Sequence, residues 1–210
     1  AALSELGRSR LTPVRSSREP PSEVQSARAH LGQIAARYIP NDSRVVLGAG
    51  NTTLEVARAL RQKSGLQVMT NSLEVALELS RYPAIRTIST GGEVDGDFST
   101  LNGSVTQRVL QSHYFDLAVI SVSGIDTHSG CTVQSPMNVI ALDLMIKHAD
   151  QLMIVVDHLK FGVVAFAHLC DLEDIDLLIV DEMPSDPALV EAIKKANVEF
   201  VVAAQPTADR

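Results

Sequence analysis

Two glycines and three polar residues form a turn that could hold a phosphate group. In the stretch VVLGAGNTTLEVARAL, Gly48 and Gly50 permit tight backbone turns, and Asn51, Thr52 or Thr53 can cap the helix expected to follow. A helix N-terminus presents unpaired N–H groups and the positive end of the helix dipole, which together favour anions. The stretch matches neither the Walker pattern nor GxGxxG, so an ordinary capped helix is the alternative interpretation.

Two further turns have residue types that could approach a ligand. In VMTNSLEVA, Thr70, Asn71 and Ser72 stand between an apolar run and a helical pattern, where they could bind a ligand or simply cap a helix. In STGGEVDGD, Gly91 and Gly92 would let the backbone approach a ligand closely, although a plain glycine turn explains them equally well.

Charged residues mark two other turns. Asp126, in SVSGIDTHSG, could accept hydrogen bonds from sugar hydroxyls, act as a general base, or stabilise its own turn. In VVDHLKFG, Asp157 and Lys160 come just after a strongly apolar run. A lone lysine is usually a surface charge, but Lys160 is expected at the same sheet end as Asn51, where its ammonium would neutralise a phosphate. This coincidence favours phosphate binding.

The elements that must position these turns alternate along the chain. Short apolar runs predict strands over 44–47, 66–70, 85–89, 117–122, 152–156, 176–180 and 199–203. Amphipathic patterns predict helices over 27–38, 52–62, 72–79, 105–112, 139–148 and 187–197. Strands that are apolar on both faces and alternate with helices indicate an α/β, doubly wound fold, with a mostly parallel sheet covered by helices on both faces. Ligands bind such sheets beyond the carboxyl ends of the strands.

Composition excludes several kinds of protein. The formal net charge of −7 gives no global attraction to nucleic acid or to an anionic membrane. Cys131 and Cys170 lie far apart without metal-ligand spacing, and the six histidines show none either, so we expect free thiols and neither a metal nor a cofactor. No apolar run approaches the length of a membrane span and no signal peptide is present, which predicts a cytoplasmic protein.

One domain is expected, covering 27–210. Residues 1–26 are rich in Arg, Ser and Pro and lack a sustained period, which is typical of a linker or an N-terminal arm. The chain begins with Ala, which favours a fragment of a longer protein.

The motifs, taken in order, resemble the C-terminal sensor domain of DeoR-family bacterial transcription regulators. They are GNTTLEVARAL, VMTNSLEVA, the Gly91–Gly92 pair, SGID, and DHLKFG followed by DIDLLIVDE. The resemblance covers about 27 to the end of the chain. It implies the sugar-phosphate isomerase fold of ribose-5-phosphate isomerase and a phosphorylated sugar as effector.

The resemblance also implies a set of binding residues. The family's phosphate-binding turn falls on Gly50, Asn51, Thr52 and Thr53, its TNSL turn includes Thr70 and Asn71, its lysine is Lys160, and the polyol faces Asp126, Gly91 and Gly92. This sequence departs from the family pattern at Asn51, Ser123 and Leu159, and it lacks the charged residues usual at the start of the helix near Pro136. These departures leave the identity of the effector open.

Three functions compete. The leading hypothesis is a sensor that binds a phosphorylated sugar, forms a homodimer or homotetramer, and acts as part of a repressor of a carbohydrate-utilisation operon. It would reach DNA only through a winged helix-turn-helix that this chain does not contain. The second is a sugar-phosphate isomerase or deaminase using Asp126 and Asp157, and the third is an interaction module whose site has decayed.

Overall fold

A seven-stranded parallel sheet forms the centre of the protein. The computed structural model describes residues 22–96 and 99–203, so residues 1–21 of the predicted linker lie outside the described part. The strand order is β12-β11-β9-β6-β1-β2-β3, and every pairing within it is parallel. The strands are β1 (Arg44–Leu47), β2 (Leu66–Thr70), β3 (Ile85–Ser89), β6 (Leu117–Ile120), β9 (Leu152–Val156), β11 (Leu177–Val180) and β12 (Glu199–Val202). All seven were predicted, to within two residues at each end.

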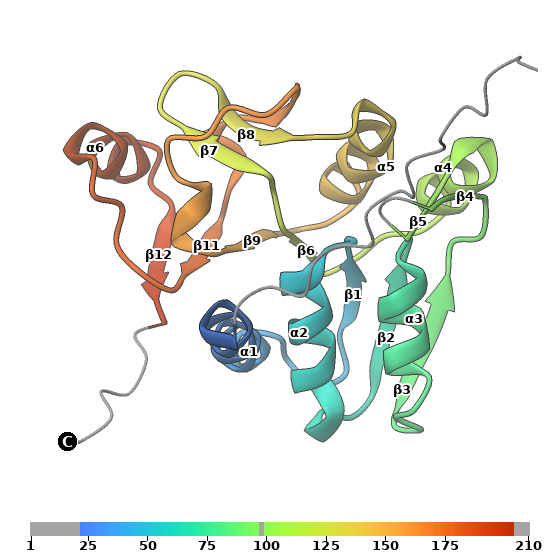
Figure 1. The fold of residues 1–210 in the computed structure, drawn as a ribbon. Helices are drawn as coiled ribbons and strands as arrows, with labels where there is room; N and C mark the ends of the chain where they lie inside the picture. The colour runs from blue at the N-terminus through green and yellow to red at the C-terminus, as the bar shows by residue number, and fades with distance from the viewer. Residues whose placement is uncertain (1–21, 97–98, 204–210) are drawn as a thin grey trace, which may run out of the picture.

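Helices cover both faces of this sheet, as the sequence predicted. Figure 1 shows α1, α2 and α3 on one face and α5 and α6 on the other. The helices are α1 (Ser22–Arg37), α2 (Asn51–Ala59), α3 (Leu73–Leu79), α4 (Gly103–Gln111), α5 (Pro136–Lys147) and α6 (Pro187–Lys195). Two separate hydrophobic cores result. One lies under α1 to α3, and the other lies under α4 to α6.

Burial on both faces explains why the central strands read as continuous apolar runs. Every residue of β6, β9 and β11 is buried, and alternate residues contribute to opposite cores: Val155 belongs to the core under α1 to α3, and Ile154 to the other. The edge strand β12 is only partly covered. Each fully buried aliphatic side chain stabilises the fold by roughly 1.5–3 kcal/mol, which offsets the entropy of ordering the chain.

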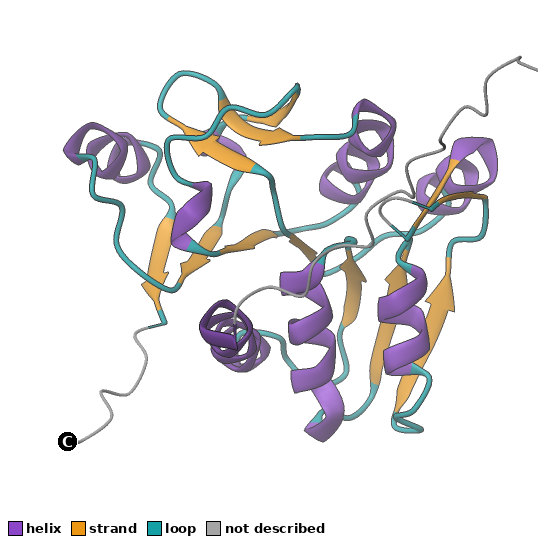
Figure 2. Ribbon diagram, viewed as in Figure 1, coloured by secondary structure: helices purple, strands orange, loops and turns teal. Residues whose placement is uncertain are grey.

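Two small antiparallel sheets were not predicted from the sequence. One consists of β7 (Gly124–Asp126), β8 (Gly130–Val133) and β10 (Ala167–Cys170), and the other is the hairpin of β4 (Glu93–Asp95) and β5 (Thr100–Asn102). Figure 2 shows β7 and β8 standing apart from the main sheet. The first sheet pairs Cys131 with Cys170 as directly opposite, buried, free cysteines.

The helix bounds differ from the prediction at several ends. Helix α1 begins at Ser22, five residues earlier than expected, so its first turns belong to the segment predicted as linker. Helix α5 begins at Pro136, three residues earlier than expected, because proline suits the first helical turn. Short 3-10 turns, which were not predicted separately, are η1 (Leu60–Gln62), η2 (His158–Lys160) and η3 (Leu172–Asp174).

The strand order changes direction between β1 and β6. From β1 the chain builds outward through β2 and β3, and from β6 it builds the opposite way through β9, β11 and β12. The carboxyl ends of β1 and β6 therefore flank the crevice in which doubly wound sheets bind ligands. Over residues 22–96 and 99–203, none of the helices has the length and apolar character needed to cross a bilayer, and no group of three potential metal ligands occurs.

Candidate ligand-binding site

A cavity of about 290 Å³ lies at this crevice. Its lining residues come from α1, α2 and α5, from the turns after β1 and β6, from β5 and β8, and from η2. They are Arg28, Ala49, Gly50, Asn51, Thr52, Thr100, Ser121, Val122, Ser123, Val133, Gln134, Ser135, Asn138, Leu142 and Lys160. A wider groove of about 580 Å³ runs between α1 and α2, but it lies away from the strand ends and holds none of the predicted site residues.

Helix α2 presents its N-terminus to the cavity. Its N-cap is Gly50, at φ 142° and ψ 161°, and no side chain caps the helix. The predicted capping by Asn51, Thr52 or Thr53 is therefore wrong: the Thr53 hydroxyl instead donates to the Gly50 carbonyl at 2.9 Å. The first-turn N–H groups keep their capacity to bind an anion, and Gly50, Asn51 and Thr52 all line the cavity.

A second helix N-terminus meets the same cavity. Helix α5 has Ser135 as its N-cap, again without a side-chain capping bond, and Ser135 and Asn138 are lining residues. The side-chain oxygen Oδ1 of Asn138 accepts hydrogen bonds from Asn102 Nδ2 at 3.0 Å and from Thr100 Oγ1 at 3.3 Å. Since both bonds end on the oxygen, the Asn138 NH₂ group is left to donate elsewhere.

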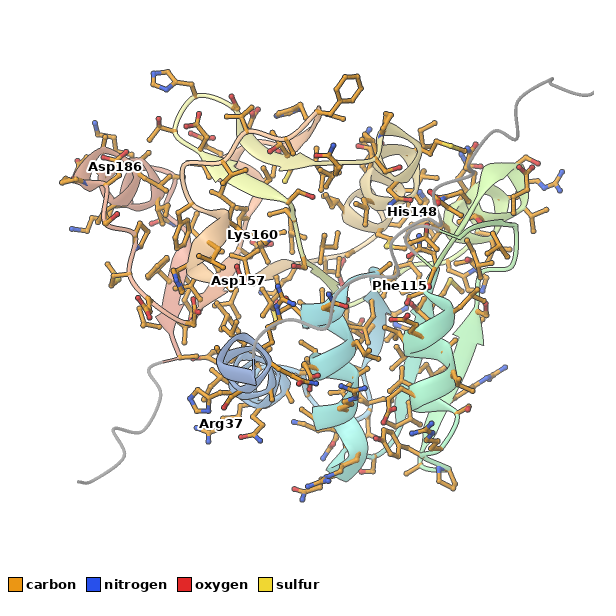
Figure 3. All side chains as sticks on the ribbon, in the orientation of Figure 1. Arg37, Phe115, His148, Asp157, Lys160 and Asp186 are labelled. Atoms are coloured by element: carbon orange, nitrogen blue, oxygen red, sulfur yellow. The ribbon has the colours of Figure 1, made fainter. Side chains whose placement is uncertain are left out.

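Two cations line the cavity from opposite parts of the chain. Lys160 comes from η2 after β9, as the sequence predicted for its strand end, and Arg28 comes from α1. Arg28 Nη2 and Nε donate to Asp157 Oδ2 at 3.0 and 3.2 Å, and this carboxylate is 3% exposed. Figure 3 shows Asp157 and Lys160 together at the end of β9, with Asp157 on the side of α1.

The rest of the lining is neutral. Hydroxyl and amide groups come from residues that include Thr100, Ser121, Ser123, Gln134 and Asn138, and apolar contact comes from Ala49, Val122, Val133 and Leu142. The Ser123 hydroxyl is fixed because it accepts the backbone N–H of Gln134 at 3.1 Å. Among the described residues, no carboxylate, imidazole or thiol lines this cavity.

Thr70 and Asn71 have structural contacts away from the cavity lining. The buried Thr70 hydroxyl accepts the backbone N–H of Ser72 at 3.0 Å, and Asn71 Nδ2 donates to the Leu101 carbonyl at 3.3 Å. The Leu101 backbone N–H donates in turn to the Asn71 carbonyl at 2.7 Å. This turn therefore holds the β4–β5 hairpin, which brings Thr100 to the cavity.

Gly91 and Gly92 are also outside the cavity lining. The Gly91 carbonyl accepts a hydrogen bond from Thr106 Oγ1 at 2.6 Å, so the glycine turn is attached to α4. A Cβ atom on Gly92, at φ 122°, would lie 2.4 Å from the Asn102 carbonyl oxygen, so no other residue fits there without movement.

Asp126 stabilises its own turn and lies outside the lining as well. Its Oδ1 accepts the backbone N–H groups of His128 at 2.9 Å and Ser129 at 3.1 Å, and these bonds lower the pKa of the Asp126 carboxyl. This is the turn-stabilising role that the sequence had left open. Ligand contact by Asp126, and by the other predicted residues outside the lining, stays a prediction.

A hydrogen-bonded pair, His158 with Asp181, lies beside the site. His158, in the same 3-10 turn as Lys160, places Nδ1 2.9 Å from Asp181 Oδ2 and donates its backbone N–H to Asp181 Oδ1 at 2.6 Å. The hydrogen bond to Asp181 raises the pKa of the His158 imidazole above its ordinary value.

Sequence reasoning missed Arg28, Thr100, Gln134, Ser135 and Asn138. Ser135 followed by Pro136 is a helix-start signal, and it could have placed this turn beside the others. Arg28 gave no local signal, because its partner Asp157 lies 129 positions further along the chain.

Comparison with known proteins identifies the family. The model of the DeoR C-terminal sensor domain matches residues 23–182. The chain belongs to this family. This DeoR sensor domain is 32% identical over 176 residues to the HTH-type transcriptional regulator YulB of Bacillus subtilis, covering 84% of this chain and 67% of YulB.

Other curated relatives of this DeoR sensor domain carry repressor names. The putative aga operon transcriptional repressor of Escherichia coli O157:H7 is 29% identical, with 88% of this chain and 70% of the repressor covered. The HTH-type transcriptional repressor GlcR of B. subtilis is 32% identical, with 87% and 69% covered. The chain thus spans about two-thirds of the length of these regulators.

Solved structures share the fold at low sequence identity. A translation initiation factor eIF-2B of Pyrococcus horikoshii aligns with a TM-score of 0.51 and 14% identity over 74% of this chain and 63% of that one. The ribose 5-phosphate isomerase of Plasmodium falciparum aligns with a TM-score of 0.49 and 14% identity over 66% and 54%.

Proposed function

We propose that this domain senses a monosaccharide phosphate, which binds in the cavity between β1 and β6. The observation that carries the proposal is the meeting of two uncapped helix N-termini and two cationic side chains in one cavity whose remaining polar lining is neutral. Such a lining suits a ligand with one anionic end and several hydroxyl groups.

The phosphate end is assigned to the start of α2 and to Lys160. The N–H groups of the first turn donate to phosphate oxygens, and the dipole of α2 favours their negative charge. Lys160 adds a full positive charge at the same cavity. Because Asp157 already balances most of the charge of Arg28, the local surplus is close to that of one cation, which suits a single phosphate.

The sugar end is assigned to the start of α5 and to the turn after β6. Ser121, Ser123, Gln134 and Asn138 can both donate and accept hydrogen bonds, which is what a polyol requires. The cavity volume is at the lower end of the range of roughly 300–1,000 Å³ for ligand pockets, so a monosaccharide fits better than a dinucleotide.

The arrangement favours binding over turnover. Isomerisation of a sugar phosphate needs a positioned acid and base, and the two aspartates considered for that role are committed elsewhere. Asp126 accepts two backbone N–H groups of its own turn, and Asp157 is paired with Arg28. We therefore propose a non-enzymatic role.

The relatives support the regulatory part of the proposal. Their names include an aga operon repressor and a glycerol-3-phosphate regulon repressor. We propose that the protein containing this domain represses a carbohydrate operon in the cytoplasm, as a homodimer or homotetramer, and binds DNA through an N-terminal winged helix-turn-helix region. Ligand binding changes the relative population of two arrangements of the assembly, which alters the affinity for DNA.

Matched titrations test this proposal. Thermal unfolding is followed with glucose 6-phosphate, ribose 5-phosphate and glycerol 3-phosphate, and with the three unphosphorylated compounds. A ligand at ~100 times its Kd stabilises the fold by roughly 2.7 kcal/mol, so we expect a clear rise in Tm with at least one phosphorylated compound alone.

Two lysine variants localise the effect. Lys160→Ala is expected to abolish the rise, whereas Lys195→Ala, on the exposed surface of α6, keeps it. Stabilisation by sugars irrespective of the phosphate, or a full response in Lys160→Ala, would contradict the assignment. A folded protein that binds none of the compounds would remove the proposal.

A further inference from the structure

Arg28 connects the cavity to helix α1. It lies in the second turn of α1, its side chain is 15% exposed, and it lines the same cavity as Lys160. Arg28 lies within a helix, whereas the residues predicted to form the site lie in turns that follow the strands. Any molecule that fills the cavity therefore touches α1 through this side chain.

The ion pair of Arg28 with Asp157 leaves binding capacity on both sides. Both hydrogen bonds from the guanidinium end on Oδ2, while Oδ1 of Asp157 is buried and has no hydrogen-bond partner in the described structure. A guanidinium carries five N–H donors, so two bonds to one oxygen leave others for a second anion. A one-sided pair of this kind can exchange partners.

Helices α1 and α2 pack closely against each other beside the cavity. Gly32 lies one turn after Arg28, on the same face of α1, where a Cβ atom would come within 2.5 Å of the Glu55 backbone in α2. Helix α2 begins in the cavity at Asn51. A ligand at the cavity thus contacts both members of this pair, α2 by its N-terminus and α1 by Arg28.

We propose that Arg28 couples the binding of a ligand in the cavity to the position of helix α1. In the structure Arg28 donates to Asp157; the anionic group of a bound ligand competes with Asp157 for the guanidinium and fixes the first turns of α1 in a second position. This inference rests on the proposed function and adds its regulation. A ligand shifts the equilibrium between the two positions only by the difference between its affinities for them, and Arg28 supplies that difference.

Calorimetric titration of three variants tests the role of Arg28, with the most stabilising of glucose 6-phosphate, ribose 5-phosphate and glycerol 3-phosphate as the probe. Arg28→Gln is expected to weaken binding by about 10- to 100-fold, the loss of a hydrogen-bonded charge. Asp157→Asn is expected to strengthen binding several-fold, because it frees the guanidinium. Arg37→Gln, which removes an exposed cation from the same helix, is the control and is expected to leave binding unchanged.

Hydrogen exchange of residues 22–37 tests the transmission. We expect the probe to slow exchange in the first two turns of α1 in the wild type and in Asp157→Asn, but not in Arg28→Gln. Should Arg28→Gln unfold because Asp157 is left unpaired, the double variant Arg28→Gln/Asp157→Asn takes its place, with the same weak binding expected.

The outcomes separate the two proposals. Three results would each overturn the role of Arg28 and leave the sensor proposal standing. They are a wild-type affinity in Arg28→Gln or in the double variant, weaker binding in Asp157→Asn, and unchanged hydrogen exchange in α1 when the wild type binds the probe. A wild type that binds none of the three compounds would overturn the sensor proposal itself.

Discussion

Gly32→Ala should separate α1 from α2. A Cβ atom at this position would lie 2.5 Å from the carbonyl carbon and oxygen of Glu55 and 2.8 Å from the amide nitrogen of Val56, whereas ordinary contact begins near 3.4 Å. The neighbouring atoms are backbone and cannot rotate away, so the helices must move apart by about 1 Å.

Two opposing terms set the size of the effect. Overpacking typically costs about 1–3 kcal/mol, while replacing a helical glycine by alanine contributes about 0.5–1 kcal/mol. The mid-range values of the two terms leave a net destabilisation of about 1 kcal/mol, or roughly 2–4 °C in Tm for a domain of this size. Urea unfolding of Gly32→Ala would be compared with Gln33→Ala, an exposed neighbour that changes helix propensity without a clash and is expected to stay within about 0.5 kcal/mol of the wild type.

The variant also probes the site. Because Gly32 and Arg28 share one face of α1, the displacement should loosen the pair between Arg28 and Asp157 and change the affinity for the sugar phosphate. If Gly32→Ala proved as stable as Gln33→Ala, the close packing of α1 on α2 and the transmission built on it would both be refuted.

Two further predictions concern titrating groups. The pair with Asp181 raises the pKa of the His158 imidazole in the folded protein. The pair therefore contributes its full stabilisation at pH values below the ordinary histidine pKa, and this contribution is lost as the pH rises through the higher pKa of the folded protein. Urea unfolding should therefore show a larger stability difference between wild type and His158→Gln at pH 5.5 than at pH 9, and an equal difference at both would contradict the pair. The hydrogen bond with Cys131, together with burial, raises the pKa of the Cys170 thiol, and the thiolate is the reactive form. Ellman's reagent should label these cysteines much more slowly in the native protein than in urea, and equal rates would show that the thiols are accessible.

Local signals were sufficient for the main sheet but not for the small ones. A strand such as Leu152–Val156 can be predicted from its own residues, because five consecutive apolar side chains indicate a strand that is buried on both faces. Strand Gly124–Asp126 has no such local signal, since it is only three residues long. It depends on the close approach of Val163, whose carbonyl oxygen would lie 2.1 Å from a Cβ atom on Gly124. Contacts of that kind are set by the tertiary fold.

The site residues also fall into those that the local sequence predicts and those that the tertiary fold determines. The turn at Gly50 and the lysine after β9 were predictable, because parallel strands bring their carboxyl ends to one edge of the sheet. Asn71 was predicted for the same reason but is buried under the β4–β5 hairpin, which a one-dimensional pattern does not reveal. Arg28 was missed because a helix residue far upstream reaches the cavity only through its ion pair with Asp157.

The charges around the cavity explain how a chain with a net charge of −7 can bind an anion. The acidic residues beside the site have partners: Asp157 accepts two hydrogen bonds from Arg28, and Asp181 accepts the backbone N–H of His158 and pairs with its imidazole. Helix N-termini and Lys160 then determine the local field, because a distant surface charge is screened within about 10 Å at ordinary ionic strength whereas a group at the cavity is not. Among the described residues, no carboxylate lines the cavity to act as a base. These charges are the ones expected of a site that holds a sugar phosphate without converting it, as we propose for this domain.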